Sequence, residues 1–313
     1  MTNVAFVGAG NMAREHARAL ADIDGVKLAG VYSRTPERGR KLGADFGMPA
    51  FDSIAALHAA TQADLVVIAV SELSAGEVTA ECFAYPWTCL IEKPAGHDLP
   101  AAEAIAAAAR AQHRQAYVAL NRRHYSSTRA VVNALANDEG ARFIHVQDQE
   151  DPRAALAVGR PKAVCDNWMY ANSIHLIDLF AVLGRGHITG VQVVQPWRPD
   201  DPSVVIARIS YDSGDIGLYQ AVWNRPGPWA VAVTTASVRW EMRPIEDAAF
   251  QPYGQRKLEP VARSDWDTKF KPGLRAQAEL AVRAARNEAA PELPTLDDAL
   301  ASMRLTRDIY SHS

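Results

Sequence analysis

The sequence predicts an α/β protein of two domains. We expect a doubly wound parallel sheet over residues 1–122, then an α+β domain with a mainly antiparallel sheet over residues 123–313. Two observations carry this prediction. The first 120 residues alternate short apolar runs with helical stretches, whereas strand-like segments follow one another in the second half. The length of 313 residues also suits two domains of about 150 residues each.

Composition narrows the class of protein. Lys and Arg number 33 against 36 Asp and Glu, a net charge of −3, which gives no support to a nucleic-acid partner. The 48% hydrophobic fraction excludes disorder for most of the chain. No apolar run approaches the roughly 20 residues that span a bilayer, and the first residues lack the pattern of a signal peptide. We therefore expect no membrane contact and a cytoplasmic location.

Cysteine usage agrees with a reducing compartment. Cys82, Cys89 and Cys165 are an odd set without CxxC spacing, so we expect small buried side chains and neither disulfides nor a metal site. No metal-ligand spacing such as HExxH and no GxSxG nucleophile motif occurs, which leaves a hydrolase without support.

In the first half, continuous apolar runs are typical of strands buried on both faces of a parallel sheet. The expected strands are Val4–Val7, Val26–Tyr32, Leu65–Val70, Cys89–Ile91 and Tyr117–Leu120. Thr35-Pro36 and Asp98-Leu99-Pro100 each pair a capping residue with an early proline, which predicts the start of a helix.

The second half combines helices with consecutive strands. Asn167–Leu183 is expected to form one long apolar helix, and Ala248–Asp267 a surface excursion. Thr295 would cap the last helix, with two acids in its first turn. The other expected helices are Ser127–Ala136, Leu274–Asn287 and Leu296–Tyr310, and the expected strands are Phe143–Gln149, His187–Gln195, Val204–Tyr211, Asp215–Trp223, Ala230–Thr235 and Ser237–Met242.

A glycine motif follows the first strand. Residues 8–13 read Gly-Ala-Gly-Asn-Met-Ala, a GxGxxA sequence placed between a strand and a helix. Gly8 would permit the tight turn, and Gly10 would let the backbone approach a pyrophosphate. The free N–H groups of the following helix would bind phosphate. The motif predicts a dinucleotide site that includes Gly8, Gly10, Asn11 and Met12.

The end of the second strand bears on the choice of cofactor. An NAD enzyme usually carries an acid there for the ribose hydroxyls, but this chain has Ser33 in that place. Arg34 and Thr35 would bind a 2′-phosphate, since a guanidinium matches phosphate oxygens in fork geometry, and Arg38 would add charge. We therefore favour NADP, the alternative being NAD bound without the acid.

Four further motifs, taken with the glycine motif, resemble those of a known protein family. They are Glu92-Lys93-Pro94 after a strand, Asn121-Arg122-Arg123, the helical Ser173-Ile-His175-Leu-Ile-Asp178-Leu and the terminal Thr295-Leu-Asp-Asp298-Ala-Leu. Together with the glycine motif, they resemble the glucose–fructose oxidoreductase / inositol dehydrogenase / rhizopine-catabolism (Gfo/Idh/MocA) family over nearly the whole chain. The resemblance implies an N-terminal Rossmann domain, often with a cis peptide before Pro94, and a homodimer or homotetramer built on the open face of the second sheet.

The resemblance also implies roles for individual residues. Lys93 would lie beside the nicotinamide, position the substrate and shuttle a proton, with His175 as proton acceptor or its partner. The spacing places Asp178 one helical turn from His175 on the same face, where its carboxylate would orient the ring or raise its basicity. Further candidates for cofactor contact are Val70, Ser71, Glu92 and Asn121, and for substrate contact Arg122 and Asn172. Arg123 is weighed evenly between site residue and structural ion-pair partner.

One departure from the family pattern leaves two functions open. Many members have an aspartate four residues before the histidine, and this chain has Ala171 there. The leading hypothesis is an NADP-dependent oxidoreductase that moves a hydride to or from a sugar, nucleotide-sugar or polyol carbon, with Lys93 and His175 handling the proton. The alternative is a dinucleotide-binding regulator of the same fold without turnover.

Overall fold

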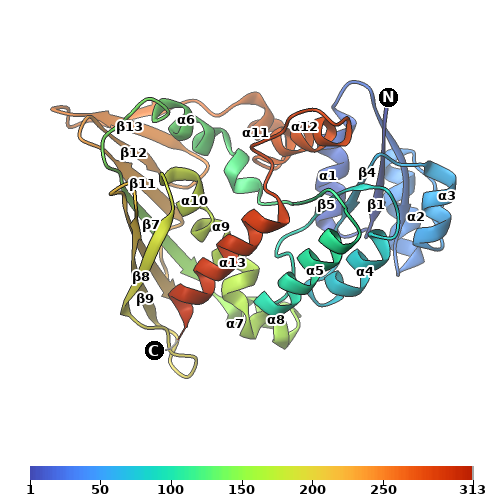
Figure 1. Ribbon diagram of the computed structural model, residues 1–313, viewed down its shortest axis with the longest axis horizontal. Helices are drawn as coiled ribbons and strands as arrows, with labels where there is room; N and C mark the ends of the chain where they lie inside the picture. Colours follow the sequence, from blue (N-terminus) through green and yellow to red (C-terminus); the bar gives the residue numbers. More distant parts are fainter. Residues whose placement is uncertain (312–313) are drawn as a thin grey trace. The chain divides into compact units, whose positions relative to one another are not determined.

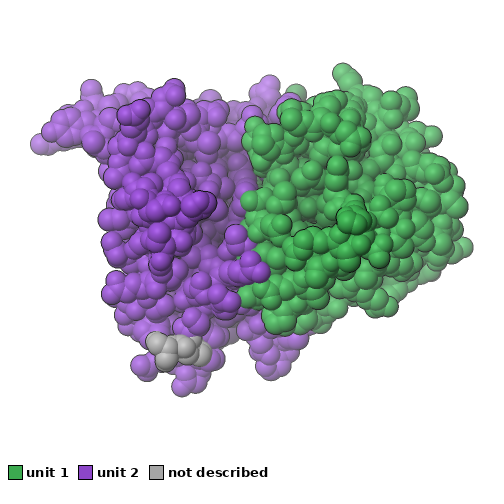
Figure 2. Space-filling view, viewed as in Figure 1, with its two compact units in different colours: residues 1–121, 269–300 green, residues 122–268, 301–313 purple. Residues whose placement is uncertain are grey.

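The structure is a computed structural model that describes residues 1–311. Contacts divide the chain into two compact units (Figure 2). Unit 1 comprises residues 1–121 and 269–300, and unit 2 comprises residues 122–268 and 301–313. This division places residues 269–300 with the first unit, whereas the boundary expected from the sequence, at 122/123, assigns them to the second.

Unit 1 contains a six-stranded sheet in the order β3-β2-β1-β4-β5-β6, in which every pair is parallel. The predicted doubly wound domain is confirmed (Figure 1). All residues of β4 and β5 are buried, because helices cover both faces. The strands are β1 (Thr2–Val7), β2 (Val26–Tyr32), β3 (Ala50–Phe51), β4 (Leu65–Ile68), β5 (Thr88–Ile91) and β6 (Ala116–Val118).

The helices of unit 1 begin where the sequence supplies caps. Asp98 accepts a hydrogen bond from the Ala101 amide at 2.8 Å and starts α5, and Pro36 opens α2 behind Thr35. The helices that connect the strands are α1 (Asn11–Ala21), α2 (Pro36–Phe46), α3 (Ile54–Thr61), α4 (Ala75–Cys82) and α5 (Leu99–Ala111).

Helix α12 (Leu274–Ala285) explains why residues 269–300 belong to unit 1. Its apolar positions recur at helical spacing and enter the same core as Ala17 and Leu20 of α1. These positions are Leu274, Ala278, Ala281 and Val282. Burial of this face against α1, rather than sequence order, fixes the membership of the segment.

Helix α13 (Leu296–Tyr310) starts with the predicted cap. Thr295 Oγ1 accepts from the Asp298 amide at 3.1 Å, and Asp298 Oδ2 accepts from the Thr295 amide at 2.8 Å. This reciprocal pair is a capping box with an acid in the third helical position.

Unit 2 is built on an eight-stranded sheet in the order β14-β13-β12-β11-β7-β10-β9-β8. The β10–β7 pair is parallel and the others are antiparallel, as the sequence predicts. The strands are β7 (Phe143–Glu150), β8 (Ile188–Gln195), β9 (Val204–Tyr211), β10 (Ile216–Trp223), β11 (Ala230–Thr234), β12 (Val238–Met242), β13 (Ala248–Pro252) and β14 (Glu259–Val261).

Helices pack on one face of this sheet (Figure 1). Phe180, Leu176 and Val131 enter one core with alternate residues of the central strands. The helices of unit 2 are η2 (Asn121–His124), α6 (Ser126–Ala134), α7 (Pro152–Ala157), α8 (Lys162–Asp166), η3 (Met169–Ser173), α9 (Ile174–Ile177), α10 (Leu179–Leu183) and α11 (Asp265–Lys269).

Two expectations for this unit are wrong. The segment Asn167–Leu183 is not one regular helix, because η3 is a π-helical turn that widens the backbone before α9. The segment Ala248–Asp267 is not a surface excursion. It adds β13 and β14 to the sheet edge, and the buried Asp267 accepts from the Ser126 amide at 2.6 Å, which caps α6.

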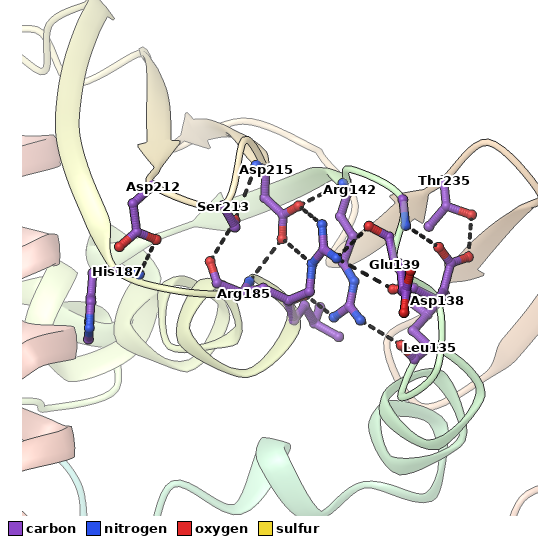
Figure 3. A network of polar contacts seen from close by, with 12 residues as sticks. Leu135, Asp138, Glu139, Arg142, Arg185, His187, Asp212, Ser213, Asp215 and Thr235 are labelled. Carbon is purple, nitrogen blue, oxygen red and sulfur yellow. Dashed lines mark hydrogen bonds and ion pairs between the residues drawn. The ribbon is translucent and has the colours of Figure 1, made fainter.

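A buried charge network fixes the beginning of the central strands (Figure 3). Asp215 Oδ1 accepts from Arg185 Nη2 at 2.6 Å and from the Arg142 amide at 2.8 Å. The Arg142 guanidinium in turn donates to the carbonyls of Leu135 and Leu183 at 2.6 and 2.8 Å. One network therefore joins α6, α10, β7 and β10.

The cysteines are buried, as predicted. Cys82, Cys89 and Cys165 all lie in the interior, and burial raises the pKa of the Cys89 thiol to about 12. Within residues 1–311, no helix has the length and apolar character needed to cross a membrane.

Candidate cofactor and substrate sites

The glycine turn places the two predicted glycines in different situations. Gly8 has a φ of +106°, and a Cβ there would lie 2.1 Å from the Ala69 carbonyl oxygen. Gly8 is therefore required by the approach of the turn to the end of β4. A Cβ on Gly10 would meet nothing within 4 Å. No packing contact within the protein therefore requires glycine at position 10, and the absence of a side chain leaves room there for a bound group.

Helix α1 begins at this open position. Gly10 is the N-cap and provides no side-chain cap, and no acidic residue lies in the first turn. Asn11 is exposed and Met12 half-buried at the helix start, while Ala13 is fully buried against the sheet. Uncapped N–H groups and the positive end of the helix dipole suit the phosphates of a dinucleotide. These features fit the cofactor that the motif predicts.

The loop after β2 carries the residues predicted to bind a 2′-phosphate. Arg34, Thr35 and Arg38 are exposed, and Ser33 Oγ accepts from the Thr35 amide at 3.3 Å. Arg34 Nη1 reaches Ser74 Oγ at 3.5 Å, so the loop lies beside the segment after β4. Ser71 Oγ donates to Ser74 Oγ at 3.0 Å in that segment, which also contains Val70.

These loops share one edge of the sheet. Strands β2, β1, β4 and β5 are adjacent and parallel, so the loops that follow them leave from the same carboxyl edge. Ligands of doubly wound sheets bind at this edge. The structure thus brings together the predicted residues of the four loops: Gly8, Gly10, Asn11 and Met12; Ser33, Arg34, Thr35 and Arg38; Val70 and Ser71; and Glu92 and Lys93.

The Glu92-Lys93-Pro94 segment follows β5. The Lys93–Pro94 peptide is cis, as the resemblance implies, and Lys93 is half-buried. Glu92 Oε1 lies 2.6 Å from His16 Nε2, and His16 is 1% exposed in helix α1. This bond ties the segment to the helix that begins at the glycine turn. His16 could not be predicted from the sequence, because nothing in the sequence links it to Glu92, 76 positions away.

Asn121 ends unit 1. Its side chain is buried, and Nδ2 donates to the Pro272 carbonyl at 3.0 Å. The bond anchors the segment before α12.

In unit 2, His175 is 6% exposed on α9. Asp178 is 1% exposed and forms a double hydrogen bond with Arg123, at 2.7 and 2.6 Å. Ser302 Oγ donates to the same carboxylate at 2.6 Å. Arg123 is therefore the ion-pair partner of Asp178, one of the two roles weighed for it.

Asn172 lies on the π-helical turn η3, and its Nδ2 donates to Glu150 Oε2 at 2.8 Å. Trp168 Nε1 donates to the same oxygen at 2.6 Å. Glu150 and its neighbour Asp148 were missed as candidates. A signal was present: in the alternating pattern of β7 they continue the buried face of Ile144 and Val146, where an acid is unexpected.

Arg122 packs between aromatic rings. Its guanidinium carbon lies 4.6 Å from the centroid of Trp229 and 5.9 Å from that of Tyr125. Burial lowers the pKa of Arg122, and the nearby Tyr125 and acidic groups oppose this shift. An arginine has no deprotonated form near neutral pH, so Arg122 remains a buried cation that would attract an anionic or hydroxyl group.

Comparisons with known proteins agree with this arrangement. A family described as "Oxidoreductase family, NAD-binding Rossmann fold", the Gfo/Idh/MocA family, matches residues 2–120. A 4-carboxy-2-hydroxymuconate-6-semialdehyde dehydrogenase from a Sphingobium species is 24% identical over 233 residues, 72% of this chain and 73% of its own. A UDP-N-acetylglucosamine 3-dehydrogenase from Acidithiobacillus ferrooxidans is 33% identical over 108 residues, 34% of this chain and 33% of its own.

Solved structures extend the likeness to the whole fold. A solved structure of the UDP-N-acetylglucosamine 3-dehydrogenase GnnA from Acidithiobacillus ferrooxidans aligns with a TM-score of 0.78 and 19% identity. The alignment covers 98% of this chain and 96% of that chain. A dehydrogenase from Chromobacterium violaceum aligns with a TM-score of 0.83 and 20% identity over 98% and 94%. At these identities the likeness shows a shared fold.

Proposed function

We propose that the chain, whose residues 2–120 match the Gfo/Idh/MocA oxidoreductase family, is an NADP-dependent dehydrogenase of a sugar-like hydroxyl. The observation that carries the cofactor half of the proposal is the glycine turn. Gly8 is needed by packing, but Gly10 faces open space at an uncapped helix start, as a pyrophosphate would require.

NADP is preferred over NAD because of the loop after β2. Ser33 takes the place of the usual acid, and the exposed Arg34, Thr35 and Arg38 supply donors and positive charge for a 2′-phosphate. The remaining cofactor contacts proposed are Val70, Ser71, Glu92, Lys93 and Asn121. When bound, the nicotinamide would supply the hydride chemistry.

The chain's own residues would manage the proton of the substrate hydroxyl. Lys93 is half-buried, and a lysine in such surroundings serves as an acid or base once its charge is partly desolvated. His175 would share this proton, since a neutral imidazole has one ring nitrogen that donates and one that accepts. Asp178, already bound by Arg123 and Ser302, would hold the helix that carries His175 in place.

The substrate class follows from polar groups in unit 2 and from relatives. Asn172 and Arg122 are suited to hydroxyl and anionic groups, as a nucleotide sugar, sugar or polyol presents them. One relative is named for UDP-N-acetylglucosamine, which belongs to this class. We further propose a homodimer or homotetramer in a cytoplasmic setting, without nucleic acid or membrane.

The test is hydride exchange. NADPH deuterated at C4 is incubated with the protein and a panel of UDP-N-acetylglucosamine, glucose and myo-inositol, each also supplied as its keto form. Deuterium found on a substrate carbon supports the dehydrogenase. Cofactor binding without exchange on any compound would contradict it and favour the regulatory alternative.

A further inference from the structure

Two acidic side chains lie together inside unit 2. Asp148 and Glu150 are two positions apart on β7, so they project from the same face of the strand. Their exposures are 1% and 0%. The same face carries Ile144 and Val146, so both carboxyl groups enter a largely apolar core.

Each acid has one oxygen with good donors. The Tyr219 hydroxyl donates to Asp148 Oδ2 at 2.7 Å, and Tyr219 lies 2.8 Å from the Tyr310 hydroxyl. Glu150 Oε2 accepts from Trp168 Nε1 and Asn172 Nδ2. The network therefore runs from β10 and α13 through β7 to the π-helical turn.

The other oxygen of each acid is left without a donor. Within the part of the chain that the structure describes, Asp148 Oδ1 and Glu150 Oε1 are buried and have no hydrogen-bond donor. Two ionised neighbours of this kind would carry a large desolvation cost. A hydrogen on Glu150 Oε1 donated to Asp148 would satisfy both oxygens.

The electrostatics favour Glu150 over Asp148 as the carrier of this proton. Burial, and then the charge of Asp148, raise the pKa of Glu150 well above its ordinary value. Burial raises the pKa of Asp148 as well, but the Tyr219 hydroxyl opposes that shift. The other titratable groups that face the pair are Tyr219, Tyr310 and the cation of Arg122. No group of three or more His, Cys, Asp or Glu side chains suited to a metal ion occurs in residues 1–311.

We propose that Glu150, sharing one proton with Asp148, is a positioning residue that fixes the orientation of Asn172 for substrate recognition. Because one N–H of Asn172 Nδ2 is committed to Glu150, Oδ1 and the second N–H are left for a ligand. The amide oxygen accepts hydrogen bonds and the N–H donates them. Asn172 would therefore recognise a substrate group that both donates and accepts, as a hydroxyl does. The recognition role rests on the proposed dehydrogenase function, whereas the shared proton does not.

The shared proton is tested on the protein without substrate. Infrared spectra at pH 7 are expected to show the C=O stretch of a protonated carboxylic acid, and Glu150→Gln should remove it. Glu292→Gln, at an exposed position, is the matched control and should keep the band. A spectrum without the band, or a band that survives in Glu150→Gln, would overturn the proposal.

The orientation of Asn172 is tested by amide exchange. In nuclear magnetic resonance spectra, the Asn172 side-chain NH₂ should exchange slowly with water in the wild type. Glu150→Gln keeps an acceptor for it and should preserve slow exchange, whereas Glu150→Leu should raise the rate at least tenfold. Equal exchange in all three proteins would show that Glu150 does not hold Asn172.

The role in recognition is read from kinetics with the active panel compound. Glu150→Leu should raise KM about tenfold with kcat changed less than about threefold, and Glu150→Gln should restore KM. A collapse of kcat in Glu150→Gln with KM unchanged would make Glu150 a proton donor and contradict a positioning role. If no panel compound turns over, the infrared and exchange results still stand, so failure of the proposed function is told apart from failure of this inference.

Discussion

At the scale of single residues, Lys93 carries the heaviest chemical role in the proposed function. We expect Lys93→Ala to lower kcat by about 10²- to 10⁴-fold, the usual contribution of a positioned acid or base. NADPH affinity should fall much less than kcat, because the variant removes one proposed cofactor contact but leaves the glycine turn and the loop after β2, which would hold the phosphates. Stopped-flow turnover and a binding titration measure the two effects. Lys257→Ala, at an exposed position, is the control. Normal turnover in Lys93→Ala would remove Lys93 from the mechanism.

Whether the role of a residue can be predicted from the sequence depends on how far along the chain its hydrogen-bond partner lies. Motifs identified Glu92, Lys93 and His175 because their neighbours in sequence define them. The partner of Glu92 is His16, and Glu150 is the shared acceptor of Asn172 and Trp168. These contacts join separate elements, so only the folded chain displays them.

At the scale of elements, the two glycines in the turn between β1 and α1 have different roles, one in stability and one in cofactor binding. Gly8→Ala should destabilise unit 1 severely, because its Cβ would overlap the Ala69 carbonyl in a left-handed backbone conformation. Gly10→Ala has room for its Cβ and should leave stability within about 1 kcal/mol, yet weaken NADPH binding at least tenfold. Thermal melts and cofactor titration check both variants. Equal cofactor affinity in Gly10→Ala and the wild type would contradict the assignment of the pyrophosphate site.

The network in Figure 3 predicts a pH effect on unit 2. Burial alone raises the pKa of Asp215, but hydrogen bonds from Arg185 and from two backbone amides outweigh burial and hold that pKa below its ordinary value. A lowered folded-state pKa means that the ionised carboxylate stabilises the fold above the unfolded pKa of about 3.9. This contribution is lost as the pH falls through the folded-state value.

Asp215→Asn should therefore lower the free energy of unfolding at pH 7 by about 3–5 kcal/mol, as expected when one partner of a buried ion pair is removed. The difference from the wild type should shrink as the pH drops below about 4. Urea titrations at several pH values measure it. Asp247→Asn removes an exposed pair with Arg263 and should cost about 1 kcal/mol or less. A penalty for Asp215→Asn that does not change with pH would rule out this origin.

Secondary structure was predictable where the pattern is local. The parallel strands and the Thr295 cap follow from short apolar runs and side-chain chemistry. The π-helical turn at Met169–Ser173 was not predicted, because apolar spacing does not report a one-residue change in helix width. Strands β13 and β14 were missed because prolines and polar residues at a sheet edge resemble a loop.

At the scale of the whole molecule, the length indicated two domains, but the linear boundary does not follow the packing. Residues 269–300 return to unit 1 through α12, whose apolar face matches that of α1. The apolar spacing of an amphipathic helix predicts that one face is buried, but it does not identify the element that this face packs against. The fold class was therefore predictable, whereas the assignment of this helix required the structure.

Assembly is a prediction at the same scale. Light scattering of the purified protein should give the mass of two or four chains, as the family resemblance implies. Dilution across a wide concentration range should leave this mass unchanged. A stable single-chain mass would contradict the proposed homo-oligomer without touching the fold.

The central claim is that unit 1 binds a phosphorylated dinucleotide through the glycine turn and the Ser33–Arg38 loop. The most direct measurement is a pair of fluorescence titrations, with NADPH and with NADH, on the wild type and on Arg34→Ala. We expect tighter binding of NADPH than of NADH, and we expect Arg34→Ala to reduce this preference about tenfold, a loss of about 1.4 kcal/mol. A preference for NADH would contradict the 2′-phosphate site, and no binding of either cofactor would contradict the proposed function itself.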